Sequence, residues 1–261
     1  MEELRWHIIR AVIAILIGAI VVFIFVKEIV NNVLLAPAHS DFITYKYLCE
    51  AGHFFRLGNS LCLAGVKVSF ISTAMTGQFI SSFTIAFMGG FVVAFPYVFW
   101  EFWRFVRPAL SPKELKKTRG VIFWVSLLFF LGITFGYFII APYTVNFFAN
   151  FQLDENIENR WTITSYIDTL VPLILGTGLA FQLPLVMFFL AKVGLMSPDF
   201  LRRNRKYAIV IILILAGIIT PPDVISQIIC TIPLMLLYEI SIWLTAKVQK
   251  EKELEEKEEW S

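Results

Sequence analysis

The side chains able to do chemistry are few in this chain, and they lie far apart in the sequence. Gln182 and Glu239 stand inside long apolar runs. Asp223 follows two prolines, and Glu114 is the only acid in a loop that holds six lysines and arginines. No Ser/His, paired-Asp or His-Glu-x-x-His arrangement accompanies them, so the sequence gives no support for covalent or metal-dependent catalysis. Hydrogen bonding and ion pairing remain, which indicates a binding protein rather than an enzyme.

A nearly continuous apolar run from 207 to 246 is broken once, by Thr220-Pro221-Pro222-Asp223. Neither proline donates a backbone hydrogen bond, and Pro222 pushes Pro221 out of helical geometry. The run therefore predicts two helices joined by a tight turn. The first helix, 207–219, has thirteen residues and reaches only about 20 Å of a roughly 30 Å hydrocarbon core. Either the bilayer thins there or neighbouring helices cover the polar turn.

Composition predicts an all-α integral membrane protein with several spans. The 261 residues are 58% hydrophobic, include 26 Phe and have a mean hydropathy of +0.74, far too apolar for a soluble domain of this size. The first span is too long, and too poorly terminated by small residues, for a cleaved signal peptide. Six transmembrane helices are expected, at 8–26, 78–103, 121–143, 167–190, 207–219 and 224–246.

The basic residues predict the orientation of these spans. Seventeen of the 22 lysines and arginines lie before the first span, in the loops 104–119 and 192–206, or in the tail. Lysine and arginine accumulate on the cytoplasmic side, so both termini are expected in the cytoplasm. The chain is then a single six-span membrane domain, 1–246, followed by a charged cytoplasmic tail, 247–261, expected to be a solvated or frayed helix.

The segment 27–77 is too long for a simple connector and is predicted to form a periplasmic cap of short amphipathic helices. It contains Cys49 and Cys62, on the side of the membrane where oxidation is possible. The two cysteines form a disulfide or, alternatively, pack as small buried thiols. Cys230, inside the last span, is expected to be a packing residue.

Four short phrases follow one another along nearly the whole chain, on the expected six-span framework. They are Glu3-Leu4-Arg5, 105–110 followed by Glu114, Phe181-Gln182-Leu183-Pro184, and Thr220-Pro221-Pro222-Asp223 with Ser226-Gln227. Together these phrases resemble one family, TatC, the receptor subunit of the twin-arginine protein translocase. The resemblance implies a glove-shaped fold with short fifth and sixth spans, in the bacterial inner membrane.

The resemblance also implies the partners. A protein of this family binds the twin-arginine signal peptides of folded cargo proteins, assembles with the single-span subunits TatA and TatB, and associates with itself in a receptor complex. Transport is driven by the proton-motive force, with no nucleotide hydrolysed, no cofactor and no metal. The lipid bilayer is the surrounding medium, and no nucleic acid is involved.

Two cytoplasmic carboxylates are the expected arginine readers, because a carboxylate matches the planar fork of a guanidinium. Glu114 alone is as well explained as a helix-start residue paired with Lys117, but the family places an arginine-reading glutamate at its position. Glu3 is the second reader, or else a solvated acid favoured by the helix dipole. The family usually carries a His-Leu pair before this phrase, whereas here only Met1 and Glu2 precede it. Leu4, Arg5, Phe105 and Pro108 complete the expected signal-peptide site.

A second expected site lies within the bilayer. Pro184 cannot donate to the carbonyl of Ala180, so the Gln182 amide either satisfies that carbonyl or docks a partner helix or the inserted signal peptide. Family members often carry glutamate at this position, so no protonation role is assigned to Gln182. Asp223 either caps the last helix or contacts partners. The partner-docking set is Gln182, Pro184, Thr220, Asp223 and Gln227.

A small-molecule secondary transporter is the rival hypothesis, suggested by the broken helices and by Gln182 and Glu239 within the membrane. It predicts inverted repeats and several polar residues that converge at the midplane. The sequence shows neither feature, so the receptor hypothesis is preferred.

Overall fold

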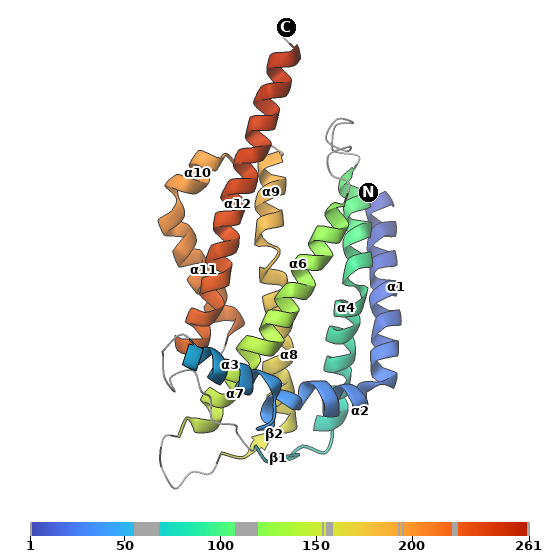
Figure 1. Cartoon of the computed structure of the whole chain (residues 1–261). Coiled ribbons are helices and arrows are strands. Elements are labelled where there is room, and N and C mark those ends of the chain that lie inside the picture. Colours follow the sequence, from blue (N-terminus) through green and yellow to red (C-terminus); the bar gives the residue numbers. More distant parts are fainter. Residues whose placement is uncertain are drawn as a thin grey trace.

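The computed structural model describes residues 2–54, 68–107, 120–152, 154, 159–192, 194, 196–220 and 224–259. Five of its helical segments are long and apolar enough to cross a membrane, as the composition predicts. They run side by side, and both chain termini lie at the same end of the bundle (Figure 1). We call this the N/C end and the opposite one the cap end. The spans are Arg5–Ile24, Gly77–Val106, Val121–Asn150, Ile163–Ala191 and Val224–Lys250.

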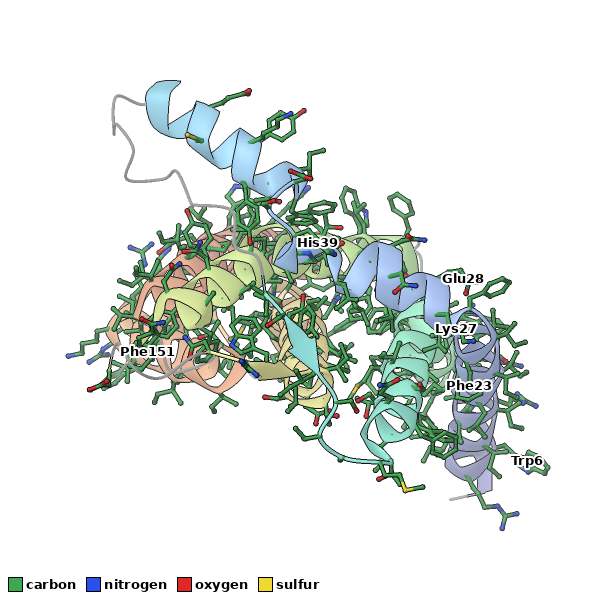
Figure 2. The ribbon with its side chains drawn as sticks, turned by 90° about the horizontal axis from the view of Figure 1, so that it is seen from below. Trp6, Phe23, Lys27, Glu28, His39 and Phe151 are labelled. Carbon is green, nitrogen blue, oxygen red and sulfur yellow. The ribbon has the colours of Figure 1, made fainter. Side chains whose placement is uncertain are left out.

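Helices α1 and α4 form one side of the bundle. Helix α1 covers Glu2–Ile24 and α4 covers Gly77–Val106, so α4 continues through Pro96 without a break. The outer face of α1 carries large exposed apolar side chains, among them Trp6, which points away from the bundle (Figure 2). In a protein with this composition such a face is solvated by lipid.

The third and fourth spans are both composite. Helix α6 (Val121–Phe135) passes through a π-helical turn, η5 (Gly136–Ile140), into α7 (Ala141–Asn150). A π-turn just before a proline is understandable, since Pro142 has no N–H to donate to the preceding turn. Helices α8 (Ile163–Ala180) and α9 (Leu183–Lys192) are separated by a turn at Phe181 and Gln182. Pro184, which cannot donate to the carbonyl of Ala180, thus lies next to a break in the helix.

The predicted interruption after 219 is present, since α11 ends at Ile219 and α12 begins at Val224. The residues Pro221, Pro222 and Asp223 lie outside the described part. Helix α11 (Arg205–Ile219) follows the short α10 (Pro198–Arg203) and has 15 residues, about 22 Å, so it does not count among the five long spans.

The expectation of a short sixth span is wrong. Helix α12 runs for 36 residues, Val224–Glu259, and its apolar part alone covers 27. The reason is that the apolar segment continues through Pro233 without a break as far as Lys250. The charged residues that follow are good helix formers and carry the helix beyond the rest of the bundle (Figure 1).

Short elements lie at the cap end. They are α2 (Val26–Ile29), a π-turn η1 (Val30–Leu34), a 3-10 turn η2 (Ala36–Ala38), α3 (Ile43–Phe54) and β1 (Phe70–Ile71), which pairs in parallel with β2 (Trp161–Thr162). They lie across the ends of the long helices (Figures 1 and 2).

Two tyrosine hydroxyls fasten this cap to the bundle, and a third links two elements within the cap. Tyr137 donates to the carbonyl oxygen of Val33 at 2.8 Å, and Tyr166 donates to that of Leu34 at 2.7 Å. Tyr45 donates to Pro37 O at 2.7 Å. These carbonyl groups lie in irregular turns, where the i to i+4 backbone hydrogen bonds of an α-helix are interrupted. The tyrosine hydroxyls therefore supply the hydrogen bonds that the backbone does not provide.

Candidate functional site

The first turns of α1 meet the last turn of α4 at the N/C end. The predicted residues Glu3, Leu4 and Arg5 follow the start of α1 at Glu2, and Phe105 lies in the last turn of α4. The two helices are antiparallel and in contact along their length (Figure 1). The structure therefore brings together two segments of the expected signal-peptide site that are far apart in the sequence.

Part of that site is not described. The side chains of Glu3 and Leu4, and the whole of 108–119 with Pro108 and Glu114, lie outside the described residues. Their assignment as signal-peptide contacts stays a prediction. Of the expected set, Arg5 and Phe105 are placed with side chains, and both are exposed, Phe105 by 41%.

Sequence reasoning missed the most deeply buried acid at this end. Glu101 is only 1% exposed, and its Oε2 atom lies 2.5 Å from Nδ1 of His7 on α1. Its other oxygen, Oε1, accepts a hydrogen bond of 3.1 Å from the Tyr97 hydroxyl, one helical turn earlier on α4. Both carboxylate oxygens are therefore partnered, which a buried charge requires.

Arginine side chains lie near this carboxylate and near its tyrosine partner. Arg10 lies close enough to Glu101 for an electrostatic interaction, and Arg104 interacts in the same way with Tyr97. The Arg104 guanidinium also lies over the Trp100 ring, 5.8 Å from its centre. A signal for the site was present in the sequence, because an acid within an apolar span is a functional candidate by default.

Gln182 lies at the break between α8 and α9 and reaches a neighbouring helix. Its Nε2 donates to the carbonyl oxygen of Val125 on α6 at 3.1 Å. The local alternative, a bond to the Ala180 carbonyl, is therefore not what the structure shows. The other amide atom, Oε1, is buried and has no hydrogen-bond partner among the described residues. The site keeps one free acceptor inside the bundle.

Two polar residues of the α11–α12 hairpin form hydrogen bonds within it, whereas the Ser226 hydroxyl lies 3.5 Å from that of Thr144 on α7. Thr220, 4% exposed, donates to the carbonyl oxygen of Ala216 at 2.8 Å. Gln227 Nε2 donates to the carbonyl oxygen of Leu213 at 3.1 Å and so links α12 to α11. Asp223 lies outside the described residues, and its capping or docking role stays a prediction.

Glu239 lies on α12 beside the start of α11. Its Oε2 forms an ion pair of 2.8 Å with Arg205 Nη2 at the start of α11. The two side chains are 45% and 50% exposed. This pair is a surface link between α11 and α12, and it removes Glu239 from the candidates for a midplane transport site.

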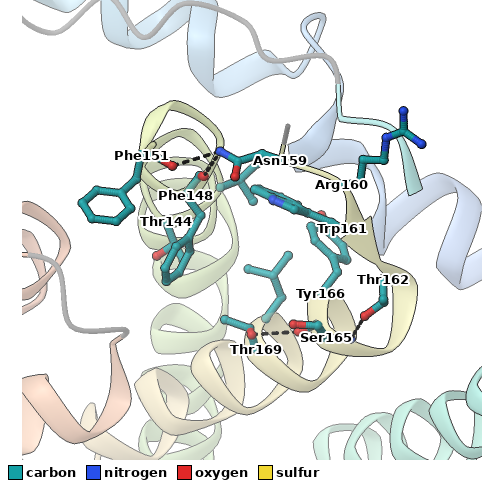
Figure 3. Close-up of a pocket in the computed structure, with 12 residues that line it drawn as sticks. Thr144, Phe148, Phe151, Asn159, Arg160, Trp161, Thr162, Ser165, Tyr166 and Thr169 are labelled. Atoms are coloured by element: carbon teal, nitrogen blue, oxygen red, sulfur yellow. Dashed lines mark hydrogen bonds between the residues drawn. The ribbon is translucent and has the colours of Figure 1, made fainter. Parts of the chain in front are cut away.

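The cavity at the cap end, about 370 Å³, lies between the end of α7 and the start of α8 (Figure 3). Asn159 donates to the carbonyl oxygen of Phe151 at 2.9 Å, and Thr162 accepts from the backbone N–H of Ser165 at 3.2 Å. Thr169 donates to the carbonyl oxygen of Ser165 at 2.8 Å. These hydrogen bonds complete the end of α7 and the first turns of α8. The polar groups that line the cavity are therefore used by the fold itself.

The cysteines also have structural explanations. Cys49 is disulfide-bonded, while Cys62 lies outside the described residues, so the predicted pairing of these two stays a prediction. Cys230 is free and fully buried, which confirms its packing role. Within the described ranges no group of three His, Cys, Asp or Glu side chains is placed to hold a metal ion.

Taken together, the long apolar helices define the class of multi-pass helical membrane proteins. The sequence model of one family, Sec-independent protein translocase protein (TatC), matches residues 1–233. The chain belongs to the TatC family, which supplies a non-enzymatic component of the twin-arginine translocase.

Similar proteins agree over nearly the full length. The Sec-independent protein translocase protein TatC of Blattabacterium is 40% identical over 97% of this chain and 95% of its own. The protein of the same name from Desulforapulum autotrophicum is 35% identical over 99% and 87%. A crystal structure titled Twin Arginine Translocase Receptor TatC in DDM covers 94% of this chain and 98% of its own, with a TM-score of 0.73 and 32% identity.

Proposed function

We propose that this protein is the receptor that binds twin-arginine signal peptides at its N/C end, in a bacterial inner membrane. The observation that carries the proposal is the meeting of the first turns of α1 with the last turn of α4. This junction puts Glu3 and Phe105 at one end of one helix pair, next to the loop that holds Glu114. The two carboxylates of Glu3 and Glu114, at the same end of the bundle, would match the two adjacent guanidinium groups of the signal peptide.

The apolar part of a signal peptide needs a surface beyond the arginines. A mostly apolar cavity of about 360 Å³ lies deeper in the bundle, lined by residues such as Gly89, Val93 and Leu175. Glu101 and Gly89 are twelve residues apart on α4, which corresponds to about 18 Å of helix. A helical apolar segment of similar length would extend from the arginine site into this cavity and bury its side chains at about 25 cal/mol per Å² wherever they leave water.

In the proposed assembly, Gln182 is the docking point for a single-span partner of the TatA or TatB type. Its unpartnered Oε1 supports this role, because a buried acceptor favours a donor from a neighbouring helix. Pro184 creates the break that turns this amide toward α6. Thr220 and Gln227 act indirectly, by fixing the hairpin next to the partner, and Asp223 contacts it at the turn. Self-association of the receptor uses the remaining lipid-facing surface.

The receptor is oriented with both termini in the cytoplasm and six spans, α11 being the shortened fifth. The clustering of basic residues at the N/C end supports this orientation. Protease added to inverted inner-membrane vesicles should remove the charged end of α12, whereas protease outside intact spheroplasts should not. Cleavage from outside would reverse the proposed orientation.

The receptor role is tested by photo-crosslinking in native membranes from probes at positions 114 and 182. One signal peptide is used in twin-arginine and twin-lysine forms. The expected result is an adduct at position 114 that the lysine form does not give. Equal labelling by both forms would contradict arginine recognition at this site.

A further inference from the structure

The buried pair of His7 and Glu101 has no part in the peptide contacts proposed above, and its position in the membrane is costly. A carboxylate that is 1% exposed loses its hydration, and an apolar residue of similar size would pack there at lower cost. Polar pairs in such positions are best explained where they fix one arrangement of two helices over others. The alignment of α1 with α4 supplies such a reason for the pair.

The pair is in register with the closest contact between α1 and α4. Gly18 lies against Gly90, and the same number of residues separates Gly18 from His7 as separates Gly90 from Glu101. Because both helices rise by the same distance per residue, these two contacts together define the register of α1 along the axis of α4. Continuing the register by one turn toward the N/C end places Glu3 level with Phe105.

His7 also contacts the exposed side of the site. Its ring lies edge-on to the ring of Phe105, with 6.3 Å between centres and an interplanar angle of 61°. Tyr97, Glu101 and Phe105 follow one another at intervals of four residues along α4. One side chain of α1 therefore touches both the buried carboxylate and the aromatic residue next to the expected peptide.

Like charges also gather at this end. Arg5 and Arg10 lie on α1, and Arg104 and Arg107 lie at the end of α4. Like charges at one end of a helix pair push the helix ends apart, and a first helical turn frays readily. The Glu101 carboxylate is close enough to Arg10 for an electrostatic attraction, so the buried pair offsets part of this repulsion.

We propose that His7 and Glu101 are positioning residues of the arginine-reading site, holding the first turn of α1 against the last turn of α4 so that Glu3 and Phe105 stay level at the N/C end, where the paired-arginine segment is proposed to bind. This inference rests on the proposed receptor function. The pair acts through Glu3 and makes no contact with the peptide itself.

The test measures binding of a labelled signal peptide, in twin-arginine and twin-lysine forms, to the purified chain in nanodiscs. His7→Ala should weaken binding of the arginine form about tenfold and change the lysine form little, since the coupling of adjacent groups is of this order. In a Glu3→Ala background the same change should add less than about twofold. His7→Gln, which retains an N–H donor for Glu101, should recover most of the affinity. Glu239→Gln breaks the Arg205 pair instead and should leave binding unchanged.

A second measurement does not depend on the peptide. Hydrogen exchange should become several times faster over residues 2–7 in His7→Ala and in Glu101→Leu, which leaves no acceptor for His7, and should stay unchanged there in Glu239→Gln. Equal binding of both peptides by the unmodified protein would overturn the receptor function and the inference together. Normal arginine preference that is lost in Glu3→Ala but kept in His7→Ala would overturn the inference alone. Full additivity of the two substitutions, or unchanged exchange at 2–7, would also overturn it.

Discussion

Gly90 of α4 lies so close to Ala19 of α1 that a Cβ atom on Gly90 would be 2.4 Å from the Ala19 backbone nitrogen. A Cβ on Gly18 would likewise lie 2.8 Å from the carbonyl oxygen of Gly90. Lipid gives helices no hydrophobic reason to associate, so close backbone packing at small residues is a main source of attraction. The glycine contact therefore holds together the two helices at whose ends arginine binding is proposed.

Gly90→Ala should separate α1 from α4, because the obstacle is backbone and cannot rotate away. Overpacking of this kind costs about 1 to 3 kcal/mol in the free energy of unfolding. A thermal melt of the purified protein in detergent, followed by circular dichroism, measures the loss. The matched control is Gly217→Ala, where the new atom meets only the flexible end of Gln227, at 3.1 Å. The same loss of stability in both variants would show that the α1–α4 contact has no special role.

The cap at the opposite end should weaken at high pH. Burial raises the pKa of Tyr45 from its ordinary value of 10.0 to about 12, and its hydroxyl donates to the carbonyl oxygen of Pro37. Because the folded pKa is the higher one, this stabilisation is complete below pH 10 and is lost as the pH rises toward 12. The melting temperature of the unmodified protein should therefore fall more steeply above pH 10 than that of Tyr45→Phe. Parallel curves for the two proteins would rule out Tyr45 as a source of this dependence.

Much of the helical framework is predictable from the sequence because its signals are local. Apolar length predicted a span at 78–103, and α4 covers Gly77–Val106. The paired prolines predicted the end of α11 at Ile219, because a missing N–H and a steric clash act within one turn. The short sixth span was implied by the family resemblance and not by the apolar pattern, since the run 224–246 is by itself long enough to cross a membrane.

The polar contacts were not predictable in the same way. Glu101 was visible as an acid in an apolar helix, but its partner His7 depends on the register between α1 and α4, which no local pattern specifies. For Gln182 the nearest free carbonyl was that of Ala180, yet the turn after α8 directs the amide to Val125 on α6. Sequence identifies which polar side chains need partners, and packing decides which partners they find.

The ion pair of Arg205 and Glu239 should contribute little to stability. Its atoms are 2.8 Å apart, but both side chains are about half exposed, so solvent and salt screen the attraction. Glu239→Gln is expected to change the free energy of unfolding by no more than about 1 kcal/mol. Chemical denaturation at low and high salt measures the effect, and the small difference should shrink further at high salt. A loss of several kcal/mol, unaffected by salt, would mean that the pair is buried against something else in the membrane.

Replacing Gln182 separates a structural role from partner docking. Gln182→Leu removes the bond to the Val125 carbonyl, but it also removes a buried acceptor that has no partner in the described part of the chain. These effects oppose each other, so the free energy of unfolding should change by less than about 1 kcal/mol. Capture of a co-expressed single-span subunit, measured by affinity purification from mild detergent, should nevertheless fall severalfold.

The matched control for this substitution is Thr231→Val, which removes a hydroxyl bonded only within its own helix, to the carbonyl oxygen of Gln227 at 2.7 Å. It should leave capture intact, because its hydrogen bond is satisfied locally and offers nothing to a neighbouring helix. If Gln182→Leu captures the subunit as well as the unmodified protein does, the free acceptor is not the docking point. If it instead unfolds the protein, the bond to Val125 is what the fold requires, and Gln182 belongs to the core of α6, α8 and α9.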